Sequence, residues 1–217
     1  MKNIPRIFAD ANLETGIRIP LSREIMHYLT RVMRTRKCLV FGDGNEYSAT
    51  ISDDDKGLII GDKTSHVDPS NNITLMFSPI KHTDDLINMA TQMGVVQFLP
   101  VITARTVAHH INWERMRKIA VEASEQSNRN SVPEILPTVK FSDLDLSNVV
   151  FADERAAYGK ELSNDFNTDK ILIGPEGGFS DEEFSALDAS GARGISLGKT
   201  ILRAETAAIV ALSKIIK

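Results

Sequence analysis

The stretch ILIGPEGGFSDEE, residues 171–183, leads from an apolar run through a glycine-rich loop to the start of a helix. The apolar run Ile171–Ile173 is bounded by turn-forming residues, as is typical of a short buried strand. Ser180 and Glu183 have the spacing of a capping box, in which each side chain satisfies a backbone donor of the other residue. The stretch therefore predicts a strand, a loop with little side-chain cover and a capped helix that ends at Gly191.

A second stretch of this kind, LGKTILRAETAA, covers residues 197–208. It runs from a predicted strand at residues 195–197, through Gly198, into a predicted helix at residues 205–217. Arg203 and Glu205 stand at the start of that otherwise apolar helix. Ligands of parallel α/β sheets bind where strands end, so we expect the two loops to share one pocket. The first loop lacks both the G-x-G-x-x-G fingerprint of dinucleotide sites and the Gly-Lys-Ser/Thr of a Walker loop.

The same alternation of strands and helices extends over residues 73–217. Strands are predicted at residues 73–77, 95–102 and 149–152. Two helices are predicted to begin after Thr83 and Asn112, which would be their N-caps. This order indicates an α/β domain with a mostly parallel sheet. Before the turn-rich segment 68–72, short apolar runs at residues 17–19, 38–41, 47–51 and 58–60 predict a small β-rich domain with one helix at residues 22–33.

Composition narrows the functional classes. The chain has 217 residues, a net charge of -4 and a single cysteine, Cys38, which excludes an internal disulfide and favours a reducing, cytoplasmic setting. No apolar run is long enough to span a bilayer. Adjacent His109 and His110 would not face one site on a regular strand, so we expect no metal site.

Positive charge is concentrated at the N-terminus. Residues 1–40 carry eight Lys or Arg against three Asp or Glu, whereas residues 41–70 carry two against seven. Such a patch is either a solvated basic face or a surface that contacts RNA phosphates. The candidate RNA-binding residues are Arg6, Arg18, Arg23, Arg31, Arg34 and Arg36.

The two loops carry a family resemblance. The strings GPEGGFSDEE (174–183) and LGKTILRAETA (197–207) resemble signatures of the RsmE family, 16S ribosomal RNA uridine-N3 methyltransferases of the SPOUT superfamily. Further matches are EASEQSNR (122–129) with VPEI (132–135), and RIF (6–8) with HYL (27–29), VMR (32–34) and FGDG (41–44). The resemblance thus covers nearly the whole chain in order.

The resemblance implies a fold, a cofactor and partners. Residues 1–70 would form a PUA-like β-barrel that binds RNA, and residues 73–217 a SPOUT methyltransferase domain with a C-terminal trefoil knot. The cofactor would be S-adenosylmethionine, the substrate 16S ribosomal RNA of the small subunit, and the active form a homodimer. The implied catalytic residues are Arg129, Arg203 and Glu205. The implied cofactor-binding residues are Ile173, Gly174, Pro175, Glu176, Gly177, Gly178, Leu197, Gly198, Ile201 and Leu202.

The chain also departs from the family pattern. Met89, Gln92 and Met93 replace a K-x-x-E-L-G motif, and Thr200 stands in place of an arginine. These departures leave open a ribose 2′-O methyltransferase of the same fold, or a noncatalytic RNA-binding or ribosome-assembly factor. A phosphate-binding metabolic enzyme would leave the N-terminal domain without a role.

Overall fold

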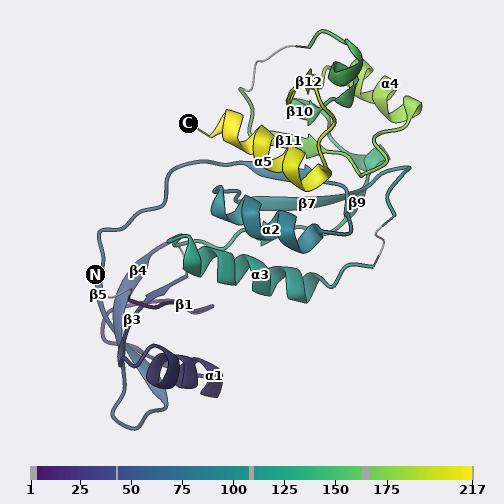
Figure 1. Cartoon of the computed structure of the whole chain (residues 1–217). Helices are drawn as coiled ribbons and strands as arrows, with labels where there is room; N and C mark the ends of the chain where they lie inside the picture. The colour runs from purple at the N-terminus through teal and green to yellow at the C-terminus, as the bar shows by residue number, and fades with distance from the viewer. Residues whose placement is uncertain (1–3, 43, 108–109, 163–166, 217) are drawn as a thin grey trace. The chain divides into compact units, whose positions relative to one another are not determined.

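The structure, a computed structural model, describes residues 4–42, 44–107, 110–162 and 167–216. His109, considered above as a metal ligand, lies outside these ranges. The chain divides into two compact units, each with its own sheet (Figure 1). Unit 1 comprises Met1–Pro69 and Ser124–Val132, and unit 2 comprises Ser70–Ala123 and Pro133–Lys217.

Unit 1 is built on a five-stranded sheet of order β1-β3-β4-β5-β2. Four of its strands, β2 to β5, occur where apolar runs between turn residues predict them. Alternating burial along the strands places Val40 and Ile60 in a core that also includes Leu13 and Leu29 from outside the strands. The strands are β1 (Arg6–Phe8), β2 (Arg18–Pro20), β3 (Lys37–Phe41), β4 (Glu46–Ile51) and β5 (Gly57–Lys63).

One helical segment accompanies this sheet. It consists of α1 (Arg23–His27) and a π-helical turn η1 (Tyr28–Val32), which together match the predicted helix. Ser22 caps it, because the Ser22 side chain accepts a hydrogen bond from the backbone N–H of Ile25.

Segment Ser124–Val132 belongs to unit 1, which the sequence does not predict. Arg6 explains this, because its guanidinium donates to the carbonyl of Ser124 at 3.2 Å and to Oδ1 of Asn130 at 2.7 Å. The same guanidinium forms a buried salt bridge with Glu46 at 2.7 Å. The backbone N–H of Asn130 in turn donates to Asp68 at 2.7 Å.

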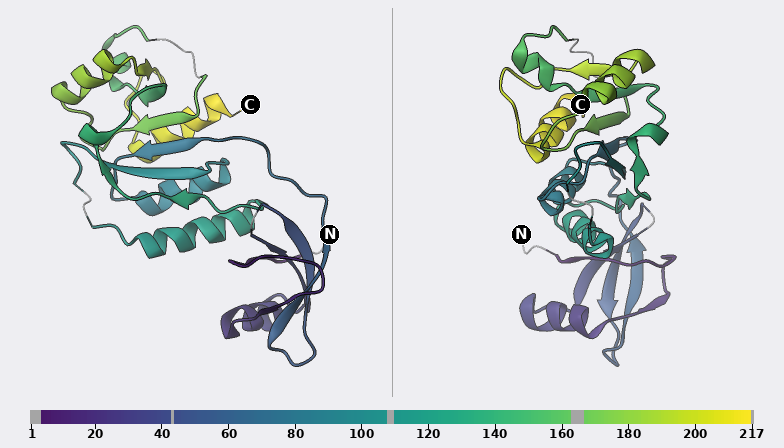
Figure 2. Two further views of the ribbon diagram at one scale, coloured as in Figure 1. Left: turned by 180° about the vertical axis from the view of Figure 1, so that it is seen from behind. Right: turned by 90° about the vertical axis from the view of Figure 1, so that its right-hand side faces the viewer.

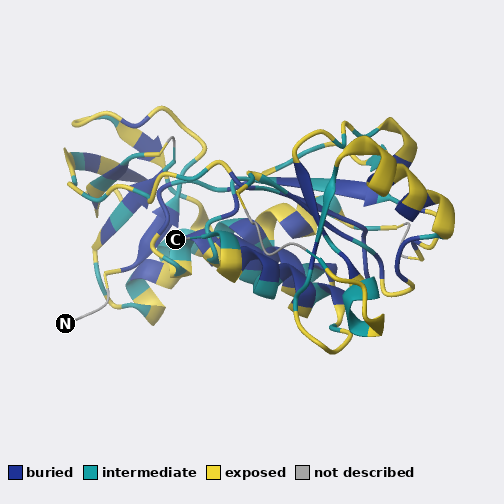
Figure 3. Cartoon of the chain, turned by 90° about the horizontal axis from the view of Figure 1, so that it is seen from above, coloured by how far each residue is buried: buried dark blue, intermediate teal, exposed yellow. Residues whose placement is uncertain are grey.

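Unit 2 contains a parallel sheet of order β12-β10-β11-β6-β7-β8, with β9 also paired to β7. Its strands are mostly buried, whereas exposed residues gather on loops and outer helix faces (Figure 3). The predicted α/β class is confirmed. The strands are β6 (Thr74–Phe77), β7 (Gln97–Ile102), β8 (Glu134–Ile135), β9 (Val139–Lys140), β10 (Val149–Ala152), β11 (Lys170–Ile173) and β12 (Arg193–Ile195).

Helices cover the sheet of unit 2. Helices α2 (Thr83–Gln92) and α5 (Ala204–Ile215) lie side by side in Figures 1 and 2, and α5 also contacts β10 and β11. Helix α4 (Asp181–Ser190) packs Phe184 and Leu187 into a core with Phe151 and Leu172 of the strands. The remaining helical segments are α3 (Trp113–Gln126), η2 (Phe141–Asp143) and η3 (Glu154–Tyr158).

The helix caps test the local predictions. The capping box of Ser180 and Glu183 is present, and Gly191 ends α4 with a φ of 80°. Asn112 accepts a hydrogen bond from the backbone N–H of Arg115 at 3.0 Å, as its predicted N-cap role requires. The prediction that Thr83 is an N-cap is wrong. Thr83 is the first helical residue, and its hydroxyl donates to the carbonyl of Ile80 at 2.7 Å instead.

Candidate functional site

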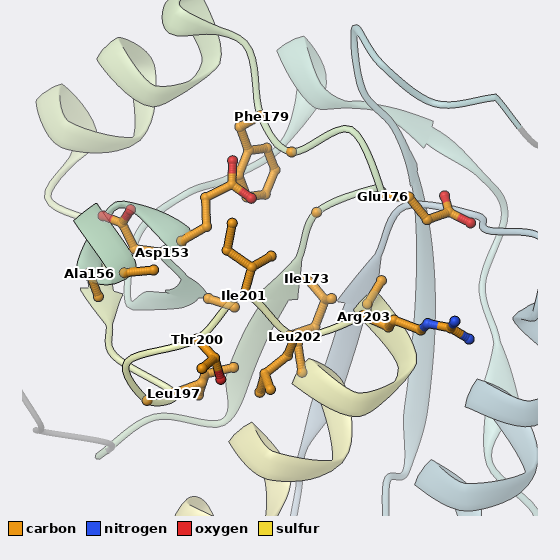
Figure 4. Close-up of a pocket in the computed structure, with 18 of the residues that line it drawn as sticks. Asp153, Ala156, Ile173, Glu176, Phe179, Leu197, Thr200, Ile201, Leu202 and Arg203 are labelled. Carbon is orange, nitrogen blue, oxygen red and sulfur yellow. The ribbon is translucent and has the colours of Figure 1, made fainter.

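Two loops of unit 2 line one cavity of about 270 Å³ at the carboxyl ends of β10, β11 and β12. The first loop, residues 174–180, connects β11 to α4, and the second loop, residues 196–203, connects β12 to α5. The two loops therefore line one cavity, as the sequence predicts. The lining is mostly apolar or backbone, as Figure 4 shows around Ile173, Ile201 and Leu202. This combination is typical of small-molecule sites.

The first loop is held in place from two sides within unit 2. The carboxylate of Glu176 accepts a hydrogen bond from the backbone N–H of Lys81 at 3.2 Å. The carbonyl of Gly177 accepts one from the guanidinium of Arg105 at 2.9 Å. Phe179 is buried beneath the loop, in edge-to-face contact with Phe151 and Phe184. Such supports fix a binding loop before its ligand arrives.

Gly178 has a conformation that few other residues adopt. Its φ is 70°, and a Cβ atom built on it would overlap the carboxylate of Glu154. Gly174 is crowded as well, since a Cβ there would lie 3.1 Å from the ring of Phe179. Glycine at these two positions therefore makes room for the side chains of Glu154 and Phe179.

Nine of the ten predicted cofactor-binding residues line the cavity. The exception is Gly177, whose exposed α-carbon faces the side chain of Arg105. The nine are Ile173, Gly174, Pro175, Glu176, Gly178, Leu197, Gly198, Ile201 and Leu202.

The three predicted catalytic residues are divided between the two units. Arg203 lines the cavity, and its side chain points with that of Glu176 away from Leu197 and Ile201 (Figure 4). Glu205 lies in the first turn of α5, half-buried and outside the lining.

Arg129 lies in unit 1 and not in the lining of the unit 2 cavity. It is buried, and its guanidinium contacts the hydroxyl of Ser131 at 3.4 Å. Burial lowers the pKa of Arg129, and the carboxylate of Asp68 opposes that shift.

The wall formed after β10 was not predicted as part of the site. This wall consists of Asp153, Glu154, Ala156 and Ala157. The cavity lining also includes Thr200 of the second loop and Ala204 of α5. A signal for this wall existed, because residues 149–152 are a predicted strand and a ligand site is expected where such strands end. Asp153 and Glu154 directly follow that strand.

Asp153 anchors this wall. Its side chain is fully buried and forms salt bridges with Arg155 at 2.7 Å and Lys160 at 3.3 Å. Burial acts to raise the pKa of Asp153, but the hydrogen bonds from Arg155 and Lys160 outweigh it and the pKa is lowered. Gly194 makes room for this carboxylate, because a Cβ there would lie 2.7 Å from Oδ2 of Asp153.

The predicted RNA-binding arginines all lie in unit 1, but they differ in availability. Arg6 is buried and engaged with Glu46 and Asn130, which removes it from an RNA-binding surface. Arg18 and Arg36 form exposed salt bridges with Asp54 and Asp55, both at 2.7 Å. Arg23, Arg31 and Arg34 are exposed, and the first two line a hollow of about 720 Å³ together with Arg36 and Lys56.

Among the described residues, no helix has the length and apolar character to cross a membrane.

Comparisons with known proteins agree with this architecture. A family described as the RNA methyltransferase domain matches residues 68–216, and one described as the RNA methyltransferase PUA domain matches residues 21–63. The chain is similar to the ribosomal RNA small subunit methyltransferase E of Rickettsia conorii, with 32% identity over 97% of this chain and 94% of the relative. The protein of that name from Aquifex aeolicus is 30% identical, over 88% and 90% of the two chains.

A solved structure is similar over the same extent. It is the ribosomal RNA small subunit methyltransferase E of Neisseria gonorrhoeae bound to S-adenosyl methionine, with a TM-score of 0.83 and 26% identity. The match covers 97% of this chain and 96% of that one. From the two-unit fold, the shared cavity and these likenesses, we conclude that the chain belongs to the ribosomal RNA small subunit methyltransferase E family.

Proposed function

We propose that this chain transfers the methyl group of S-adenosylmethionine to N3 of a uridine in 16S ribosomal RNA of the small subunit. The observation that carries the proposal is the cavity of unit 2, in which the glycine-rich first loop and the second loop, with Gly198, converge beside Arg203. Family membership supports the reaction class, and the named relatives act on ribosomal RNA of the small subunit. The ribosomal substrate and the lone cysteine favour a cytoplasmic setting.

The chemistry of the cavity lining suits S-adenosylmethionine. Its apolar lining suits an adenine ring, and a Cβ atom at Gly198 would meet no atom within 4 Å, which leaves room there for close approach and for backbone hydrogen bonds. When bound, this cosubstrate supplies a methyl group that is electrophilic because of its positively charged sulfur. The task of the loops is to hold that group in line with the attacking atom and to exclude water.

The uridine N3–H is a weak acid, so its proton has to be removed and the charge that develops on the base has to be stabilised. We assign charge stabilisation to Arg203, which is exposed at the edge of the cavity. Glu205, two residues further on in α5, is the candidate base. Arg129 in unit 1 is a second candidate for charge stabilisation.

The finer architecture is also part of the proposal. The predicted trefoil knot is supported by the side-by-side placement of β10, β11 and β12 and by the two loops that line one cavity. The predicted PUA-like barrel at residues 1–70 is supported by the five-stranded sheet of unit 1. A homodimer is supported by exposed apolar side chains of unit 2, namely Val107, Tyr158 and Ile201.

The test of the function is a methyl-transfer assay with labelled S-adenosylmethionine and small ribosomal subunits that lack the modification. We expect label in 16S ribosomal RNA, and 3-methyluridine when the RNA is digested to nucleosides and analysed by mass. A 2′-O-methylated nucleoside would identify a ribose methyltransferase instead. No transfer to either subunits or naked RNA would point to a noncatalytic factor.

The exposed arginines of unit 1 give a separate prediction about RNA binding. Arg23 and Arg31 are exposed and form no salt bridge within the described part of the chain. Replacing both with alanine should weaken RNA binding and reduce the slope of log K against log salt by about 1.5, because each phosphate contact releases counterions. Fluorescence anisotropy with a 16S fragment at several salt concentrations measures the slope. Lys63→Ala, an exposed change outside the hollow, is the control, and an unchanged slope for the double variant would place the RNA elsewhere.

A further inference from the structure

Glu154 brings an acidic side chain to the wall of the unit 2 cavity. It directly follows the N-cap of η3, Asp153, whose carboxylate accepts a hydrogen bond from the backbone N–H of Arg155. Asp153 is itself fixed by Arg155 and Lys160. The backbone that carries Glu154 therefore has a defined position at the end of β10.

The carboxylate of Glu154 reaches the first loop. A Cβ atom on Gly178 would overlap its Oε1 and would lie 2.9 Å from its Oε2. The Glu154 side chain thus lies against the bare α-carbon of Gly178. In this way the two oxygens are brought from the wall after β10 to the backbone after β11.

This carboxylate belongs to an exposed residue and has no protein partner among the described residues. No hydrogen bond or salt bridge to Glu154 occurs there, whereas the neighbouring Asp153 has two cationic partners. A carboxylate can only accept hydrogen bonds. A ligand that fills the cavity displaces water from these oxygens, and binding is opposed unless the ligand supplies donors in return.

We propose that Glu154 accepts hydrogen bonds from the vicinal 2′- and 3′-hydroxyls of the ribose of S-adenosylmethionine. The inference rests on the proposed function and adds a recognition residue to it. Two hydroxyls on adjacent carbons match the two oxygens of one carboxylate, as in dinucleotide sites where an acidic residue binds the ribose.

The surroundings of Glu154 favour the nucleoside over the amino-acid end of the ligand. Ala156 and Ala157, on the same short helix, are small and apolar. The charged side chains of Glu176 and Arg203 lie on the opposite side of the cavity from Ala156 and Leu197 (Figure 4). A charged amino-acid group is better matched on that opposite side.

Calorimetric binding of two ligands tests the assignment without any methyl transfer. S-adenosylhomocysteine contains the ribose and the amino-acid end, whereas 5′-methylthioadenosine lacks the amino-acid end. We expect Glu154→Ala to bind both ligands about 10- to 100-fold more weakly, the loss typical of hydrogen bonds to a charged group. Glu154→Gln, which keeps one acceptor oxygen, should fall between. Glu161→Gln, an exposed change of the same charge outside the cavity, should bind both as the parent chain does.

A third ligand separates the ribose from the adenine amino group. The parent chain should bind the 2′-deoxy form of 5′-methylthioadenosine more weakly than it binds 5′-methylthioadenosine itself. For Glu154→Ala the two ligands should bind equally, because the partner of the missing hydroxyl is gone.

Each other outcome has a distinct meaning. Weaker binding of S-adenosylhomocysteine alone would place Glu154 at the ammonium group and overturn the assignment. If removal of the 2′-hydroxyl weakened binding equally in the parent chain and in Glu154→Ala, Glu154 would lie at the adenine and the assignment would be overturned. Unchanged binding of all ligands by the variant would overturn the assignment as well. A parent chain that binds none of the three would overturn the proposed function itself, and the assignment with it.

Discussion

Gly178→Val should weaken the binding of S-adenosylmethionine by more than about 100-fold, while the chain still folds. Two effects combine at this residue. A φ of 70° is unfavourable for a β-branched side chain, at a cost of roughly 1–2 kcal/mol or more. In addition, the new Cβ would displace the carboxylate of Glu154 from the cavity wall. Isothermal titration with S-adenosylhomocysteine measures the loss.

Gly191→Val is the matched control for this prediction. Gly191 has a similar φ of 80° as the C-cap of α4, but it lies outside the cavity and a Cβ there meets no atom within 4 Å. Its variant should lose a similar amount of thermal stability and keep its affinity for the ligand. If both variants lost affinity equally, general destabilisation would explain the effect and the role of the first loop would be refuted.

Arg203→Ala should reduce the single-turnover rate of methyl transfer by about 100- to 1,000-fold, the cost of removing one group that stabilises developing charge. The affinity for 5′-methylthioadenosine, which lacks the amino-acid end, should change little, because the Arg203 side chain points away from Leu197 and Ile201 (Figure 4). Arg203→Lys should recover part of the rate, since it keeps the charge but loses the planar fork of donors. Rates are measured with excess enzyme over undermethylated small subunits.

Lys199→Ala provides the comparison for Arg203. Lys199 carries the same charge in the same loop and is exposed, but it does not line the cavity. We expect its variant to keep the parent rate at saturating RNA. A comparable loss in both variants would mean that positive charge on the second loop acts through RNA binding and not in the chemical step.

Much of unit 2 could be predicted because its signals are local. The capping box at Ser180 depends on a spacing of three residues, and Gly191 ends the same helix through its own φ. The strands β6, β7, β10 and β11 were predicted from apolar runs bounded by turn residues. The strand predicted at residues 195–197 is displaced, because β12 is Arg193–Ile195 and shares only Ile195 with it. Shorter elements such as β8 and β9 lack such a signal, because two residues are too few to show a period.

Some site residues could not be assigned from local patterns. The string Asp153–Ala157 has no motif of its own, and its one signal is the predicted strand that precedes it. It reaches the cavity because β10 pairs with both β11 and β12. Arg6 belongs to the basic N-terminal stretch of the sequence, yet it is buried against Glu46. Its burial depends on partners that are 40 and 124 residues away.

The sequence by itself determined the alternation of strands and helices, the two loops that line the cavity and the family resemblance. These features depend on short stretches of sequence, in which the backbone dihedral preferences of each residue and the spacing of apolar side chains determine the local structure. Only the tertiary structure decided that Glu154 lies against Gly178, that Gly177 faces away from the cavity, and that segment Ser124–Val132 joins unit 1. The physical reason is that packing and hydrogen bonding between distant segments, and not local preference, fix which side chains meet.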